Sequence, residues 1–228
     1  MEINRVNVRK YRSEDRKVVR EISVESSILS EYRNALFSDD IMADMLTSYF
    51  VDHEPSSCFV AGREGIVAGY LLGAKNVHKM RTIIKKKIFP ALGKKSIVSG
   101  QLFRKQNIVL LGYVISSYFK GEFKVPDFSH DYPATLHINI KSQYRGQNIG
   151  SLLVNHFLQY LQENGIYGIH FGVLSDNARK FFLKLGFEVL FEGEYTFLHH
   201  LTGENLPHYI MGKHLSNRKE TGKRGQAS

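Results

Sequence analysis

Six consecutive residues, Arg145-Gly146-Gln147-Asn148-Ile149-Gly150, have the composition of an anion-binding turn. They precede a segment with helical periodicity, so we expect them at a helix N-terminus, where consecutive backbone N–H groups have no intrahelical partner. The helix dipole and the small side chains there favour close approach of a pyrophosphate. A tight left-handed turn without a ligand would use the same residue types. Both interpretations stay open on these residues alone.

The segments on either side of this turn have clear periodicities. Residues 134–140 alternate between apolar and polar side chains, which predicts a strand with Ile138 on one face and His137 on the other. Residues 149–163 have apolar side chains at helical spacing, and Gly165 is expected to end that helix. The predicted apolar stripe of this helix consists of Leu152, Leu153, Phe157 and Leu161.

The rest of the chain alternates between further strands and helices. Strands are predicted over residues 6–10, 58–61, 66–72, 167–173, 187–191 and 208–212. Helices are predicted from residue 13, over 38–50 and over 176–185. The segment after residue 133 therefore has the order β-α-β-α-β-β.

The segment Leu136–Phe187 resembles the GNAT superfamily of N-acetyltransferases. Members share a strand, an Arg/Gln-x-x-Gly-x-Gly/Ala loop, a long helix, a second strand, and a helix that runs into Leu-Gly-Phe. The loop matches here at Arg145 and Gly150, while Asn148 replaces the middle glycine. Asparagine tolerates the left-handed region better than most residues, so we expect the loop shape to survive.

The resemblance implies an α/β (α+β) fold. The expected architecture is a central mixed, mostly antiparallel sheet with a splayed parallel strand pair, flanked by helices on both faces. A narrower similarity, to bacterial relatives of the acetyltransferase-like domain of O-GlcNAcase, is carried by GYLLG at 69–73, by Phe89-Pro90 and by YPATLHI at 132–138.

The same resemblance implies acetyl-CoA as acyl donor and cosubstrate, with no metal. Its pantetheine arm would pair with the backbone of Ile138 and Ile140. Asn177, or Ser175 near it, would offer a side chain to the cofactor. The pyrophosphate would rest on the loop amides of Arg145, Gly146, Gln147, Asn148, Ile149, Gly150 and Ser151.

Phe182 departs from the family pattern, although it belongs to the expected cofactor site. Many members carry a tyrosine at this place, which protonates the leaving thiolate, and a phenyl ring donates no proton. Water, Tyr195 or Tyr209 would have to serve. This departure, together with Asn148, also motivates a second hypothesis, a catalytically inactive acyl-CoA-binding or interaction module of the same fold.

Acetyl transfer to an amine needs the amine in its neutral form, and a histidine near pH 7 is a natural general base. His137 is the first candidate, with Asn139 beside it on the polar face of the strand. Tyr132, with Asp131, precedes that strand near the place where the family's acceptor enters. A hydrogen-bonded core histidine is the alternative interpretation of His137.

Other reactive groups have less support. The lone cysteine, Cys58, excludes an intrachain disulfide and a cysteine zinc cluster, and its place on a strand favours a small buried side chain. His199, His200 and His208 flank the last strands, but we expect no metal site there.

Charge is concentrated in residues 75–124, which carry twelve Lys/Arg against one acid, Glu122, in a chain of net charge +9. We expect a single N-acetyltransferase domain over 1–215, with a basic, mostly helical insert at about 75–130 and a flexible basic tail over 216–228. The insert is open to three interpretations: solvated helix faces, an anionic membrane or nucleic-acid surface, or walls of a substrate cleft.

The remaining expectations concern partners and location. The acceptor is a small-molecule or protein amine, sequence-specific nucleic-acid binding is not expected, and the chain is expected to be a monomer or homodimer. No apolar stretch approaches the roughly 20 residues of a membrane span, and no signal peptide is recognised, which together favour a cytoplasmic protein.

Overall fold

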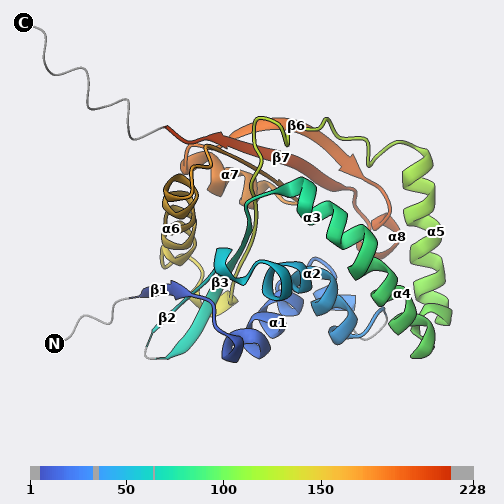
Figure 1. Ribbon diagram of the computed structural model, residues 1–228. Coiled ribbons are helices and arrows are strands. Elements are labelled where there is room, and N and C mark those ends of the chain that lie inside the picture. Colours follow the sequence, from blue (N-terminus) through green and yellow to red (C-terminus); the bar gives the residue numbers. More distant parts are fainter. Residues whose placement is uncertain (1–5, 33–35, 64, 217–228) are drawn as a thin grey trace, which may run out of the picture.

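The computed structural model describes residues 6–32, 36–63 and 65–216, and these residues form two antiparallel sheets (Figure 1). Sheet A has the order β1 (Asn7–Lys10), β2 (Cys58–Arg63), β3 (Ile66–Ala74) and β4 (Thr135–Ile140). Sheet B has the order β5 (Gly168–Val173), β7 (Leu206–His214) and β6 (Glu188–Tyr195). From residue 217 on, the tail expected to be flexible lies outside the described residues.

The two sheets are joined where β4 and β5 begin. A parallel bridge pairs Ala134 with Ile169: the Ala134 amide donates to the Gly168 carbonyl (3.2 Å), and the His170 amide donates to the Ala134 carbonyl (2.9 Å). Beyond this bridge, the described chain has no backbone hydrogen bond between β4 and β5. The splayed parallel pair and the mixed, mostly antiparallel architecture are therefore confirmed.

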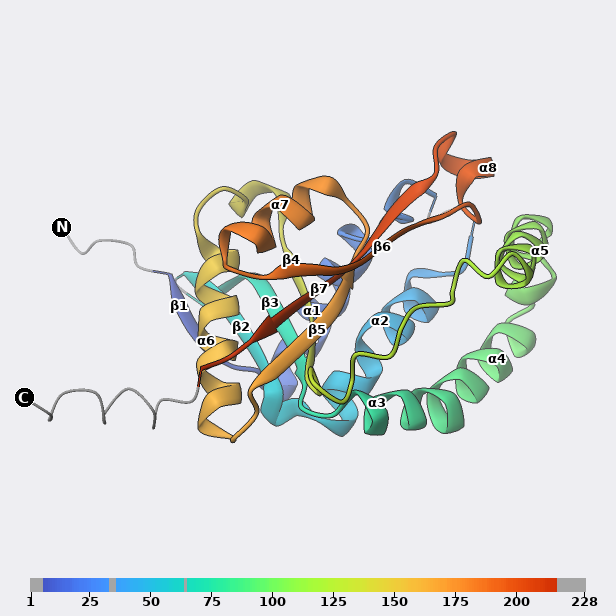
Figure 2. The ribbon, with the colours of Figure 1, turned by 90° about the horizontal axis from the view of Figure 1, so that it is seen from above.

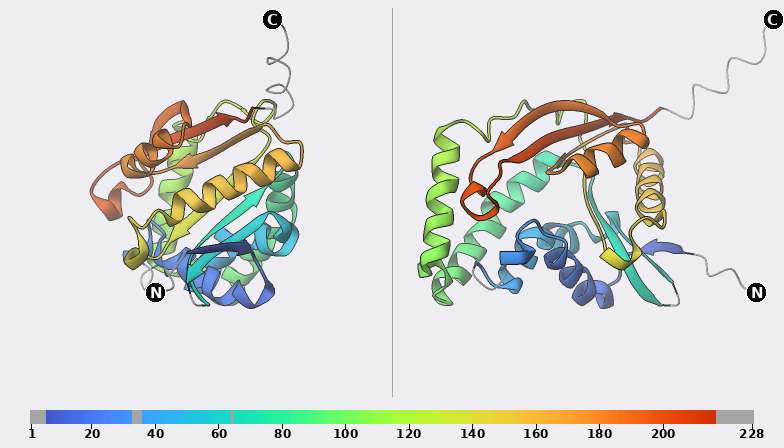
Figure 3. Two further views of the ribbon diagram at one scale, coloured as in Figure 1. Left: turned by 90° about the vertical axis from the view of Figure 1, so that its left-hand side faces the viewer. Right: turned by 180° about the vertical axis from the view of Figure 1, so that it is seen from behind.

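Sheet A has helices on both faces (Figure 3). Alternation along β2 produces this arrangement, because Phe59 and Ala61 pack towards α6 (Ile149–Glu163) while Cys58 and Val60 join the core under α1 and α2. The bounds are Arg16–Glu25 for α1 and Asp39–His53 for α2. Ser38 caps α2 by accepting from the Ile41 amide (3.4 Å). Sheet B is covered by α7 (Asp176–Lys184).

One residue of the predicted α6 stripe is wrong. Leu152 is 39% exposed, whereas Leu153, its neighbour, is fully buried. The buried face is broad enough for neighbours such as Leu153 and Val154, and Leu152 lies just beyond its other edge. The buried face consists of Ile149, Leu153, Val154, Phe157, Leu158 and Leu161.

The basic segment forms an arm of helices on the side away from α6 (Figures 1 and 2). A π-turn interrupts it just before Pro90, which has no N–H to continue the ladder of hydrogen bonds. Its elements are α3 (Val77–Ile83), the π-turn (Ile84–Ile88), α4 (Phe89–Val98) and α5 (Lys105–Phe119). A short α8 (His199–Thr202) follows β6, and single 3-10 turns occupy Ser13–Asp15, Ser30–Tyr32, Pro55–Ser57, Gln101–Phe103 and Ser142–Tyr144.

Among the described residues, no helix combines the length and the apolar character needed to cross a bilayer.

Candidate active site

The turn between β4 and α6 contains two residues in the left-handed region. Gly146 has φ 77° and Asn148, the N-cap of α6, has φ 63°. Throughout the part of the chain that the structure describes, Asn148 is the one residue other than glycine with positive φ. Asparagine therefore keeps the loop shape, as expected from its tolerance of this conformation.

The turn presents a row of unpaired backbone amides. The Arg145 amide donates to Ser142 (3.2 Å), and the next paired amide is that of Leu152, which donates to the Asn148 carbonyl (3.1 Å). In the described chain, the six backbone amides of residues 146–151, which lie between these two, donate no hydrogen bond to a turn or cap acceptor. Six donors thus gather at the positive end of a 15-residue helix, an arrangement whose chemistry suits an anion.

Two interactions hold this turn to sheet A, and one is internal to it. The Lys141 amide donates to the Ala68 carbonyl (2.9 Å), and the Arg145 Nε donates to the Ile140 carbonyl (3.2 Å). Within the turn, the Gln147 side-chain amide donates to the Gln143 carbonyl (3.2 Å). The turn carries no carboxylate, and the side chain of Arg145 is exposed. The free backbone amides and the Arg145 side chain therefore both present positive charge at this turn.

Glycine at position 150 lets α6 begin close to α7. A Cβ on Gly150 would lie 3.1 Å from Cζ of Phe181, a contact tight enough to displace the ring. Asn177 lies one turn before Phe181 and so shares that face of α7, with its side chain exposed. Ser175 is used differently, because it caps α7 by accepting from the Ala178 amide (3.2 Å).

Phe182 is a core residue. It is buried, with its ring centroid 4.5 Å from that of Phe171 and 5.3 Å from that of Phe187, both in edge-to-face geometry. Such packing stabilises the junction between α7 and sheet B. The phenyl ring at position 182 thus serves core packing, independently of any role in catalysis.

The polar face of β4 holds a small hydrogen-bond network. The Asn139 side-chain amide donates to the Tyr70 hydroxyl (2.8 Å) and to Nε2 of His137 (3.2 Å), which leaves the His137 proton on Nδ1. The antiparallel register explains the contact, since Asn139 lies opposite Tyr70 on β3. Burial lowers the pKa of His137 to about 4. This imidazole is therefore neutral at pH 7, rather than a base that titrates near it.

Tyr132 is not brought to this network. Its hydroxyl donates to Glu188 on β6 (3.0 Å), and its ring lies 4.4 Å from that of His214 on β7. Asp131 is exposed and pairs with His130. The structure thus brings His137 and Asn139 together and places Tyr132 at the closed end of the strand pair.

Sheet B carries a second pair of polar side chains in contact, Tyr195 and His208, which their positions in the sequence do not link. The Tyr195 hydroxyl and Nε2 of His208 are 3.3 Å apart, and the two rings stack at 4.4 Å. Burial raises the pKa of Tyr195 to about 12 and lowers the pKa of His208. Tyr209 points to the opposite face, where its hydroxyl donates to Asp176 (2.9 Å), which raises the pKa of that hydroxyl. Pairing of β6 with β7 creates the first contact and packing of α7 on β7 creates the second, and no single element reveals either.

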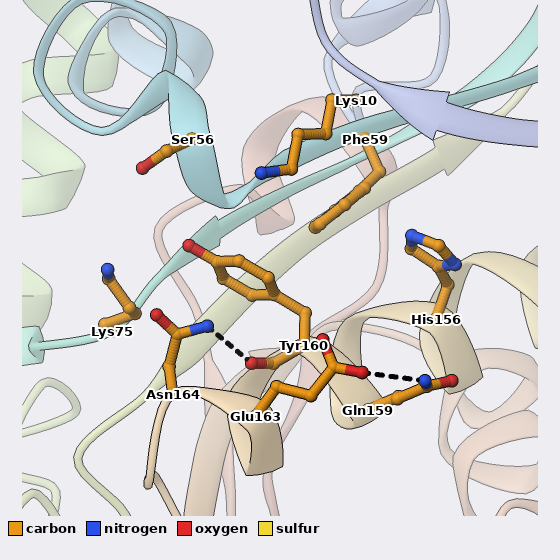
Figure 4. A pocket seen from close by; sticks show the side chains of 9 residues that line it. All are labelled: Lys10, Ser56, Phe59, Lys75, His156, Gln159, Tyr160, Glu163 and Asn164. Atoms are coloured by element: carbon orange, nitrogen blue, oxygen red, sulfur yellow. Dashed lines mark hydrogen bonds between the residues drawn. The ribbon is translucent and has the colours of Figure 1, made fainter.

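A pocket of about 550 Å³ lies elsewhere (Figure 4). It lies against the C-terminal half of α6, at the opposite end of the helix from the anion-binding turn. The ammonium groups of Lys10 and Lys75 lie 5.7 and 5.8 Å from the centroid of the Tyr160 ring, and no predicted site residue lines the pocket. Its lining consists of Lys10, Ser56, Phe59, Lys75, His156, Gln159, Tyr160, Glu163 and Asn164.

The other reactive groups are accounted for by the fold. Cys58 is fully buried, and burial raises its thiol pKa to about 12, so it is a packing residue as expected. Within the described ranges, no three His, Cys, Asp or Glu side chains gather in a way that could hold a metal ion.

Comparison with known proteins places this arrangement in context. A family model described as "Acetyltransferase (GNAT) family" matches residues 24–187. No curated protein matches the chain. Among solved structures, SsHAT is 23% identical, with a TM-score of 0.65 over 92% of this chain and 98% of its own.

Two further structures show the same fold at lower identity. The polyamine N-acetyltransferase of Drosophila melanogaster, which forms N-acetylagmatine, is 14% identical, with a TM-score of 0.58 over 92% of this chain and 100% of that one. The acetyltransferase yncA of Salmonella typhimurium, solved with its cofactor acetyl-CoA, is 14% identical, with a TM-score of 0.51 over 93% and 95%.

The left-handed turn predicts that position 148 is sensitive to residue type. Asn148→Val should lower the free energy of unfolding by about 1–2 kcal/mol, because a β-branched residue is strained at positive φ. Asn148→Gly should be at least as stable as the natural protein. Denaturant unfolding of the two variants measures the difference, and equal stability would contradict the assigned backbone conformation.

The buried imidazole predicts a pH-dependent stability. Between pH 6.5 and about 4, His137 binds a proton in the unfolded state but not in the folded state, so the free energy of unfolding should fall as the pH falls. His137→Gln should make this fall shallower by about 2 kcal/mol. His53→Gln, at an exposed histidine, is the control and should leave the slope unchanged. A slope unaffected by His137→Gln would rule out a neutral buried imidazole.

Proposed function

The chain belongs to the acetyltransferase (GNAT) family, and we propose that it transfers the acetyl group of acetyl-CoA to a primary amine by direct attack in a ternary complex. The observation that carries this proposal is the juxtaposition of the anion-binding turn with the open edge of β4. The family membership makes the chain an N-acetyltransferase. The turn suits the pyrophosphate of acetyl-CoA, and the open edge of β4 suits its pantetheine arm.

The fit to acetyl-CoA follows from donors and acceptors. The amides of 146–151, with Arg145 and Lys141 nearby, would hold the pyrophosphate. The backbone of Ile138 and Ile140 faces no partner strand once β5 has turned away, so the amide groups of the pantetheine arm would pair there as an added strand. Asn177, on the face of α7 towards the start of α6, would supply a further side chain. Bound acetyl-CoA supplies an activated thioester.

The amine would bind on the polar face of β4, beside His137 and Asn139. Its nitrogen lone pair attacks the thioester carbonyl carbon, the C–N bond forms, the C–S bond breaks, and the nitrogen gives up one proton. A pKa of about 4 means that His137 accepts that proton only transiently, at Nε2 and in place of the hydrogen bond from Asn139. A neutral imidazole also avoids placing a second cation beside the amine.

The leaving thiolate would take its proton from water. The raised pKa values make Tyr195 and Tyr209 weak acids, and Tyr209 would have to become an anion beside Asp176. An ordinary thiol titrates at about 8.5, so its thiolate leaves without help from either phenol. Phe182 is then compatible with catalysis, and the inactive-module hypothesis loses its main support.

We also propose five more specific properties of the protein. They are the single domain over 1–215, the kinship with bacterial relatives of the acetyltransferase-like domain of O-GlcNAcase, a cytoplasmic location, a small-molecule or protein amine as acceptor, and a monomeric or homodimeric state. The catalytic role of Tyr132 has the least support, because its hydroxyl is engaged by Glu188.

A single charge change in the turn tests cofactor binding. Asn148→Asp keeps the shape of the side chain, and aspartate tolerates both the left-handed conformation and a helix N-cap. The carboxylate should repel the pyrophosphate and weaken acetyl-CoA binding at least tenfold, measured by calorimetry. Asn148→Gly is the matched control and should bind as the natural protein does. Equal affinity of the Asp and Gly variants would place the phosphates elsewhere.

Two tyrosine-to-phenylalanine variants test whether a tyrosine protonates the leaving thiolate. Tyr195→Phe and Tyr209→Phe should each keep kcat within about threefold, assayed as thiol release from acetyl-CoA with a panel of primary amines. Removal of a true general acid typically costs 10²-fold or more. A loss of that size in one variant would assign the role to that tyrosine. Acetyl-CoA binding without turnover of any amine would instead revive the inactive module.

A further inference from the structure

Helix α5 has its apolar and polar sides reversed relative to an ordinary surface helix. Its buried side includes Asn107 and Ser117, whereas Ile108, Ile115 and Phe119 are 54%, 56% and 82% exposed. In an ordinary surface helix the apolar stripe faces the core and the polar side faces water. An exposed apolar helix face of this kind indicates an interaction surface.

The orientation of α5 is fixed by its inner side. Asn107 donates from Nδ2 to the Gln101 carbonyl (2.7 Å), and the hydroxyls of Ser117 and Thr196 are 3.3 Å apart. Between them, Leu110 packs in a buried cluster with residues of α8 and of the segment before α2. Rotating the helix to hide its apolar side would break these contacts, so that side stays outward.

The outward residues form one continuous stripe. Ile108, Gly112, Ile115 and Phe119 follow one another at intervals of four, three and four residues, which places them on one face of the helix. We call this stripe the α5 face. It lies at the edge of the molecule opposite α6, and none of the drawn elements lies outside it (Figures 1 and 2).

Positive charge brackets the α5 face. Lys105 begins the helix, and Lys120 and Lys124 follow its end, all three exposed. The one nearby acid, Glu122, is turned inward, where it accepts from the Thr196 amide (2.7 Å) and hydroxyl (2.6 Å). Lys120 lies 4.0 Å from Glu122, whereas Lys105 and Lys124 form no ion pair with a carboxylate among the described residues. The surface thus combines an apolar stripe with unneutralised lysines at both ends.

We propose that the α5 face docks on an anionic membrane surface, with the apolar stripe in the headgroup region and the flanking lysines on acidic lipid. Apolar stripes edged by lysines are the features that bind interfacial helices to such bilayers. A second copy of the chain fits the apolar residues but not the charge, because two faces of the same basic segment would repel one another. The face lies at the far edge from the acetyl-CoA site proposed above and does not depend on it.

Vesicle co-sedimentation of the full chain tests the proposal. The protein should sediment with vesicles of phosphatidylcholine and phosphatidylglycerol, much less with phosphatidylcholine alone, and less as salt is raised. Phe119→Ser combined with Ile115→Ser should weaken binding at least tenfold. The matched control is Ile66→Ser, at an isoleucine of sheet A that is 57% exposed. Thermal unfolding confirms that each variant is folded.

Three outcomes would overturn the proposal. The first is no binding to either vesicle. The second is equal binding by the Phe119→Ser, Ile115→Ser variant and the natural protein. The third is a dimer, detected by light scattering, that dissociates in this double variant, because it would assign the α5 face to a second copy. A Lys120→Glu, Lys124→Glu variant provides an independent arm, and should lose binding to the anionic vesicles while its apolar stripe is intact.

Discussion

The divergence of β4 and β5 after one bridge is the constraint on which the rest of the structure depends. If the strands stayed paired, sheets A and B would be one sheet and the β4 edge would be satisfied by β5. Because they part, the backbone around Ile138 is left without a partner strand, and the turn with free amides follows at the end of that strand. Helix α6 follows the turn and packs on sheet A, mainly on β2 and β3, with a fully buried stripe that includes Leu153, Phe157 and Leu161. The strand that carries the free edge therefore leads directly into the helix that covers its own sheet.

The parts of the site that depend on local sequence were predictable. Alternation over 134–140 placed His137 and Asn139 on one face, and the turn chemistry of Asn148 followed from its side chain alone. Helix α6 was predicted with its observed bounds, because its apolar spacing continues for four turns. These features need only a strand, a turn and a helix, each of which is set by residues close in the chain.

The remaining features depend on contacts between distant segments. The low pKa of His137 comes from its burial in the folded chain, where its ring lies 5.7 Å from that of Tyr70 on β3, and the residues of β4 alone do not reveal this. Tyr132 lies five residues before His137, yet its hydroxyl binds Glu188, 56 residues later in the chain. Leu152 was placed inward because the sequence does not show where a broad apolar stripe is centred. Residue type predicted the kinds of chemistry present, and tertiary packing decided which groups can perform them.

Helix α5 illustrates the same division at the surface. Its central residues, 108–115, are apolar apart from Gly112, so periodicity alone cannot indicate which side faces water. The orientation is decided by Asn107, whose Nδ2 donates to the Gln101 carbonyl while its buried Oδ1 has no partner in the described chain, and by Ser117, whose hydroxyl lies beside that of Thr196. Two polar contacts thus hold a set of large apolar side chains in solvent. Rotating α5 to bury Ile115 and Phe119 would break these two contacts, and none of the described elements covers the two side chains where they lie, so the exposed area stays available to a partner surface.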